Sequence, residues 1–281
     1  MIELAPWHKY GLPLPGPVMP AAGALGYGDA YRDLVDVTRL GALVTTPVSW
    51  RPRHAARGAR VAVRGEHVIL HTGLPNPGLR AVIREYGRLW ERYPIPVIVH
   101  LLATTVAETA RAVARLSTVA GVLGVELGLA EDAPLADAPP DDALKLVATA
   151  CAEGDLPVIA RVPFSRAAAL IPHLREVGAD ALTLTAPPRA VLPLDDVPDA
   201  DALPVLVRGR LYGPAVFPLM LGVLGRWARE AGLPIIACGG IAAAEDARAC
   251  LALGAVAVQV DAAVWRDPGV LEAIAAGVED V

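Results

Sequence analysis

The stretch Leu-Pro-Ile-Ile-Ala-Cys-Gly-Gly-Ile (233–241) runs into Ala-Ala-Ala-Glu-Asp-Ala-Arg-Ala-Cys-Leu-Ala-Leu-Gly (242–254) and then Ala-Val-Ala-Val-Gln-Val (255–260). Two apolar runs on either side of an alanine-rich helical segment predict a βαβ unit with both strands buried. Gly239 and Gly240 stand where the first strand meets the helix. Glycines there let backbone amides approach an anion such as phosphate, although a Gly-Gly pair also occurs in tight turns that bind nothing.

The same alternation of strand and helix patterns continues along the chain. Eight apolar runs are expected to be core strands, and each leads to a helix or a long loop: 18–22, 42–46, 96–102, 122–127, 157–162, 181–185, 235–238 and 255–260. This order predicts a (β/α)8 TIM barrel, with a doubly wound sheet as the alternative. No linker divides residues 1–281, so we expect a single domain, with a small hairpin region at 61–71 and a Pro/Asp-rich insertion after strand six, at 187–204.

The composition argues against nucleic-acid-binding, secreted and membrane proteins. The chain has a net charge of −5, no basic block and 54% hydrophobic residues, which argues against a nucleic-acid partner and for a large core. It has three cysteines without CxxC spacing, no signal-peptide pattern, no membrane-length apolar run and no metal-ligand spacing. We therefore expect a cytoplasmic protein with a small-molecule ligand and neither a membrane nor a bound metal.

In a barrel, ligands bind where the strands end, so charged residues at strand ends are candidates. Arg161 ends the fifth predicted strand, and its alternative role is an ion pair with Glu126 or Asp180. His100 ends the third strand and could contact a ligand or pack within the core. Glu131 could act as a general base, although several carboxylates share its loop and a solvated face is the competing interpretation.

Several motifs occur in the order found in one flavoenzyme family. They are Pro-Val-Met at 17–19, Gly-Leu-Pro-Asn-Pro-Gly at 73–78, Gly-Ala-Asp-Ala-Leu-Thr-Leu at 178–184 and Gly-Arg-Leu-Tyr-Gly-Pro-Ala at 209–215, the last expected as a loop. Together they resemble the class 1 dihydroorotate dehydrogenase family, which implies an FMN-binding barrel and a homodimer. The resemblance assigns FMN contacts to Ala22, Gly23, Thr46, Arg161, Gly213, Gly239 and Gly240.

The chain departs from that family where the chemistry takes place. Residues 128–133 read Gly-Leu-Ala-Glu-Asp-Ala where the family has Asn-x-Ser-Cys-Pro-Asn, so Glu131 stands at the position of the cysteine base, with His100 as a second proton-handling candidate. Asparagines that would hold orotate are replaced at Leu70, Gly128, Ala133 and Ala186. These replacements predict a substrate other than dihydroorotate.

The phosphate region departs as well. Asp261 and Ala262 replace a family Gly-Thr, and a carboxylate there repels phosphate unless a cation such as Arg210 compensates. Three hypotheses follow: an FMN-dependent oxidoreductase with another substrate, a flavin-free inactive barrel that acts as a binding or assembly protein, and a non-redox enzyme that uses the same phosphate turn.

Overall fold

A computed structural model describes residues 1–129, 139–194 and 205–279. Its main sheet has eight parallel strands in the order β3-β14-β13-β10-β9-β8-β7-β4, which confirms the predicted (β/α)8 barrel. The bounds are β3 (Val18–Pro20), β4 (Leu43–Val44), β7 (Val97–Leu102), β8 (Val122–Gly128), β9 (Val158–Pro163), β10 (Ala181–Ala186), β13 (Ile235–Cys238) and β14 (Ala257–Val260).

The two end strands of this sheet meet through the segment before β4. The amide of Gly41 donates to the carbonyl of Val18 at 2.8 Å. A Cβ at residue 41 would lie 2.1 Å from the carbonyl oxygen of Gly16, so only glycine allows this close approach. The contact brings the edges of the barrel together.

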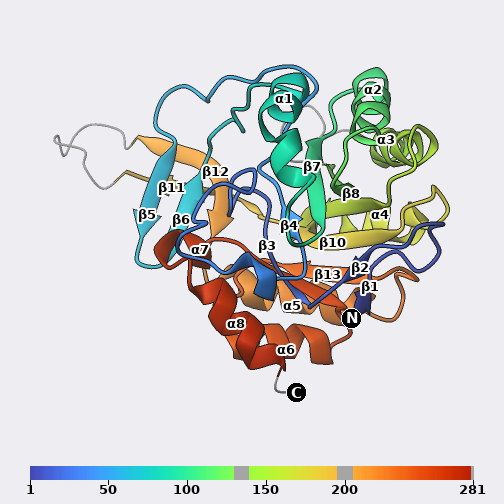
Figure 1. Cartoon of the computed structure of the whole chain (residues 1–281). Coiled ribbons are helices and arrows are strands. Elements are labelled where there is room, and N and C mark those ends of the chain that lie inside the picture. Colours follow the sequence, from blue (N-terminus) through green and yellow to red (C-terminus); the bar gives the residue numbers. More distant parts are fainter. Residues whose placement is uncertain (130–138, 195–204, 280–281) are drawn as a thin grey trace.

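Helices surround the barrel (Figure 1), and α6 falls within the alanine-rich segment at 242–254 that was expected to be helical. They are α1 (Leu79–Trp90), α2 (Val106–Leu116), α3 (Pro140–Ala152), α4 (Ala167–Leu174), α5 (Val216–Trp227), α6 (Ala244–Ala252), α7 (Ala263–Arg266) and α8 (Val270–Glu279). Two 3-10 turns, η1 (Val37–Arg39) and η3 (Phe164–Arg166), complete the helical elements of the described residues. Strands β7 and β9 are buried along their whole length, as parallel strands covered by helices must be.

A second, antiparallel sheet lies beside the barrel, at the left of Figure 1. Its order is β11-β12-β6-β5, with β5 (Val61–Arg64) and β6 (His67–Leu70) forming the predicted hairpin. It also contains β11 (Arg189–Pro193) and β12 (Leu206–Tyr212). The expected loop at 209–215 was wrong in its first half, because β12 continues to Tyr212 through pairing with β6 and β11.

The N-terminal end of the barrel is filled by apolar side chains. Strands β1 (Ile2–Glu3) and β2 (Pro13–Leu14) pair there, and Leu4, Leu12 and Leu14 form one buried cluster with residues near the starts of the barrel strands, among them Ile98, Ile159 and Ile236. Two residues further along the barrel strands, the interior becomes polar.

Candidate functional site

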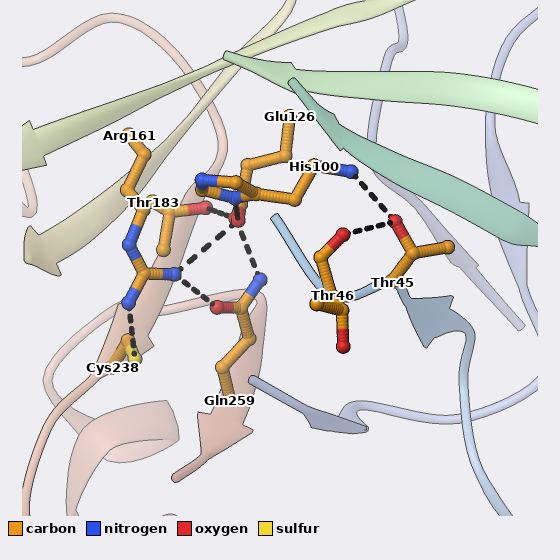
Figure 2. A network of polar contacts seen from close by, with 8 residues as sticks. All are labelled: Thr45, Thr46, His100, Glu126, Arg161, Thr183, Cys238 and Gln259. Carbon is orange, nitrogen blue, oxygen red and sulfur yellow. Dashed lines mark hydrogen bonds and ion pairs between the residues drawn. The ribbon is translucent and has the colours of Figure 1, made fainter. Parts of the chain in front are cut away.

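The polar layer of the barrel interior centres on Glu126 of β8 (Figure 2). One carboxylate oxygen lies 2.7 Å from His100 Nδ1 and 3.3 Å from an Arg161 guanidinium nitrogen. The other accepts hydrogen bonds from Thr183 at 2.5 Å and from the Gln259 amide at 2.7 Å. Five strands, β7, β8, β9, β10 and β14, therefore converge on one buried carboxylate.

The charge of Glu126 is balanced within this layer. Burial, the largest influence, raises the pKa of the carboxyl, but the Arg161 guanidinium and hydrogen bonds from His100 and Thr183 outweigh it and lower the pKa to about 2. Arg161 is itself 4% exposed and also donates to Gln259 at 2.8 Å and to the sulfur of Cys238 at 3.3 Å. Its predicted alternative role, an ion pair with Glu126, is thus present.

The thiol of Cys238 in this layer is poorly suited to take a proton from a substrate. Burial raises the pKa of the Cys238 thiol to about 12, so the sulfur stays protonated at neutral pH. The backbone amide of His100 donates to the hydroxyl of Thr45 at 3.1 Å, which in turn donates to the carbonyl of Thr46. His100 is fully buried, so its ring belongs to the barrel core.

Asp261 lies at the predicted phosphate turn. Its carboxylate accepts a hydrogen bond from the backbone amide of Ala262 at 2.6 Å and interacts with the backbone amide of Gly240. Burial raises the pKa of Asp261, while these amides and the charge of Arg161 oppose that shift. The carboxylate therefore takes hydrogen bonds from both sides of the turn that would hold a phosphate.

A cavity of about 280 Å³ opens at the same turn, lined by residues of four segments. These are the β5–β6 turn with Gly65 and Glu66, the residues Gly213 and Pro214 just before α5, the segment 240–242, and the segment 261–263 with Trp265 and Arg266. Arg266 pairs with Glu66 at 3.0 Å across this opening.

Whether FMN fits can be judged from the glycines and from Asp261. A Cβ at Gly240 would lie 2.4 Å from the backbone nitrogen of Phe217, and one at Gly213 would lie 2.4 Å from the carbonyl oxygen of Glu66. Close contacts with the protein's own backbone thus explain why both positions are glycine, without a ligand. At Gly23, by contrast, a Cβ would meet nothing nearer than Pro47 Cδ, at 3.8 Å. The residues present do not fit an FMN phosphate, because Asp261 takes its amide donors.

The structure brings some predicted site residues together and separates others. His100 and Arg161 meet at Glu126, whereas Gly213 and Gly240 line the cavity, with Gly239 preceding Gly240 in the turn. Ala22 and Gly23 follow β3, and Thr46 follows β4 with its amide bonded to Gly26. Arg210 donates to the carbonyl of Pro187 at 3.1 Å and lines a different cavity. Glu131 lies outside the described residues.

Sequence reasoning missed three members of the polar layer, Thr183, Cys238 and Gln259. Each sits two residues after an inward-facing apolar residue of its strand, namely Ala181, Ile236 and Ala257. The two-residue side-chain period of a strand was the signal that could have found them.

Comparisons with known proteins agree with this architecture. A family model described as dihydroorotate dehydrogenase matches residues 7–160 and 193–281. The chain is 34% identical to the dihydroorotate dehydrogenase B (NAD(+)) catalytic subunit of Desulforudis audaxviator, over 96% of this chain and 89% of the relative. It is 30% identical to the protein of the same name from Geotalea daltonii, over 96% and 90%.

A solved structure supports the fold. The Eimeria tenella dihydroorotate dehydrogenase in complex with ferulenol superposes with a TM-score of 0.75 at 15% identity, covering 94% of this chain and 80% of the other. Among the helices of the described residues, none has the length and apolar character needed to cross a membrane.

Proposed function

Because the chain belongs to the dihydroorotate dehydrogenase family, we propose that it keeps the family's barrel as a flavin-free protein that binds a small molecule and has left orotate chemistry. The observation that carries this proposal is the Asp261 carboxylate, which accepts hydrogen bonds at the Gly239-Gly240 turn and at Ala262. A phosphate at this turn needs the same amides.

A phosphate bound at this turn would lie close to the negative charge of Asp261. Two unit charges 4 Å apart interact by about 4 kcal/mol at an effective dielectric of 20, and a phosphate dianion carries more than one charge. Arg161 is the cation that the resemblance assigns to the flavin. It forms an ion pair with Glu126, donates a hydrogen bond to Gln259 and interacts electrostatically with Asp261. The positive charge of Arg161 therefore already interacts with the buried carboxyl groups of Glu126 and Asp261.

A second candidate function is an FMN-dependent oxidoreductase that acts on a substrate other than dihydroorotate. The cavity of about 280 Å³ beside Gly213 and Gly240 favours it, as does the open space at Gly23. In that case Asp261 turns away from the amides when a ligand enters.

Titration with FMN, followed by quenching of flavin fluorescence, distinguishes the two. We expect no binding by the wild-type protein at micromolar FMN and clearly tighter binding by Asp261→Gly, because the substitution releases the amides and removes the charge. Asp261→Asn is the matched control, since it removes the charge but keeps a side chain on the amides, and we expect an intermediate affinity.

Equal affinity in all three proteins would place Asp261 away from the ligand and remove the argument against flavin. Tight binding by the wild-type protein, seen also as a yellow colour after purification, would establish the second candidate.

A further inference from the structure

The cavity of about 280 Å³ at the turn between β13 and α6 carries a negative charge of its own. Among the residues that the structure describes, the charged ones in its lining are Glu66, Asp261 and Arg266. Glu66 and Arg266 pair at 3.0 Å, and their side chains are 63% and 73% exposed. Their charges therefore offset each other at the rim, and the charge left inside the cavity is that of Asp261.

Asp261 belongs to the wall of the cavity, because it directly follows β14 and is only 7% exposed. Its carboxylate accepts a hydrogen bond from the amide of Ala262 at 2.6 Å and interacts with the amide of Gly240. A carboxylate has about four acceptor positions, so two backbone amides leave capacity for further donors.

The protein offsets the burial of this carboxylate only in part. Arg161 and the amides of Gly240 and Ala262 lower the pKa of Asp261, but burial has the larger effect and the pKa stays raised. A cation inside the cavity would supply the missing interaction at a place where charges attract more strongly than in water. An anion would be repelled there for the same reason.

The rest of the lining favours an organic cation over an inorganic one. Figure 1 shows α7, which carries Trp265, beside the β5–β6 hairpin, and the lining between them is largely apolar, with Val68, Pro214 and Ile241. An organic ligand buries its hydrocarbon body against such surface. The described part of the chain contains no group of three or more His, Cys, Asp or Glu residues that could hold a metal ion.

We propose that this cavity binds a small organic cation, in which a primary ammonium group donates to the Asp261 carboxylate and a compact apolar body packs against Val68, Ile241 and Trp265. The inference rests on the proposed function, since it requires that FMN does not fill the cavity, and it names the chemical class of the small molecule. Hydrogen bonds between charged groups are roughly twice as strong as neutral ones. Selectivity for positive charge is therefore the property to measure.

Three probes of nearly equal size and different charge measure this selectivity: benzylamine, benzyl alcohol and benzoate. In NMR titrations of the full chain, we expect one site per chain for benzylamine, with an affinity at least about tenfold higher than that for benzyl alcohol. Benzoate should bind more weakly than both. The chain has a net charge of −5, so attraction of amines to its surface must be separated from binding in the cavity. Raising sodium chloride from about 0.15 M to about 0.5 M should change the benzylamine affinity less than about threefold, because buried charges are screened weakly.

A pair of matched variants locates the site. Asp261→Asn should weaken benzylamine binding at least about tenfold and change benzyl alcohol binding less than about twofold, whereas a merely structural role would affect both probes alike. Asp267→Asn is the control, because Asp267 is exposed, holds the amide of Gly269 at 2.9 Å and does not line the cavity. It should leave both affinities unchanged. Circular dichroism checks the folding of each variant, and the three probes on the wild-type protein decide the question if Asp261→Asn does not fold.

The inference is overturned if the wild-type protein binds benzylamine no more tightly than benzyl alcohol, or if Asp267→Asn weakens benzylamine binding as much as Asp261→Asn does. Titration with FMN separates this failure from that of the proposed function. A wild-type protein that binds neither FMN nor benzylamine keeps the flavin-free barrel and loses only the organic cation. One that binds FMN tightly loses the proposed function and this inference together.

Discussion

Glu126 is the residue on which the buried polar network depends, because its fully buried carboxylate lies at the centre of the barrel. Taking an ion pair out of water costs several kcal/mol for each ion, and the pair persists only when further hydrogen bonds satisfy both partners. Thr183, Gln259 and His100 supply these bonds to the carboxylate. Arg161 is thus committed to a structural network, which is the alternative role considered for it from the sequence.

Glu126→Gln should therefore destabilise the protein by about 3–5 kcal/mol, because it leaves the Arg161 guanidinium buried without its counterion. Urea denaturation followed by circular dichroism measures the change. Asp155→Asn is the control, since it removes the exposed ion pair with Lys9 and should leave the unfolding midpoint unchanged. A Glu126→Gln protein as stable as the wild type would show that the network carries no net stabilisation.

The pH dependence of stability provides a second test of the same residue. The pKa of Glu126 is lowered to about 2 in the folded protein, against 4.5 as the ordinary value. A lowered carboxyl pKa stabilises the folded state above pH 4.5, and that contribution, on the order of 3 kcal/mol, is lost as pH falls toward 2. Asp261 acts in the opposite direction, because a raised pKa favours the folded state at low pH and the effect disappears as pH rises.

Comparing wild type with Glu126→Gln at each pH isolates the contribution of Glu126. The difference in unfolding free energy should be largest at neutral pH and shrink between pH 4.5 and about 2, the ordinary and the lowered pKa of this carboxyl. A difference that stays constant over this interval would contradict the lowered pKa.

Among the elements, the turn between β13 and α6 shows why a glycine motif is weak evidence for a ligand. Gly240 has φ +71° and packs against the backbone of α5 at Phe217. Gly240→Ala should lower the free energy of unfolding by at least about 3 kcal/mol. An alanine in the left-handed backbone conformation costs roughly 1–2 kcal/mol, and the clash with the backbone of Phe217 adds to this cost. Gly58→Ala is matched in φ, at +78°, but has open space around it, so only the smaller cost is expected. Thermal unfolding of both variants checks the prediction, and equal shifts would refute the packing explanation.

Local patterns predicted the barrel elements and the β5–β6 hairpin well, but not the pairing of this hairpin with β12 and β11. Continuous apolar runs bounded by glycine and proline are visible in the sequence, which is why all eight barrel strands were predicted. The second half of strand β12 was expected to be a loop because its hydrogen-bond partner β6 lies far away in the chain. Thr183 and Gln259 were missed because the two-residue period of a strand shows only that they face the barrel interior, whereas their shared partner, Glu126, follows from the closed barrel.

At the scale of the whole molecule, leucines fill the N-terminal end of the barrel. The polar layer lies further along the barrel strands, and two cavities are lined in part by the second sheet. Membership of the family fixes this architecture and leaves the chemistry of the site to individual side chains. The cytoplasmic location and the homodimer remain predictions. Sedimentation of the purified chain is the direct measurement of the oligomeric state.

The whole protein should fail to oxidise dihydroorotate. A pyrimidine has several hydrogen-bonding groups, and each one buried without a partner costs about 1–3 kcal/mol. Leu70 and Gly128 offer no side-chain amide where the resemblance expects asparagine, and Leu70 of β6 lies opposite Arg210 of β12 in the second sheet. Steady-state assays with dihydroorotate, added FMN and fumarate, quinone or NAD measure turnover, with the Desulforudis audaxviator relative as the positive control. We expect no turnover above background, and turnover at the rate of the relative would show that the loop at 128–133 supplies the catalytic base after all.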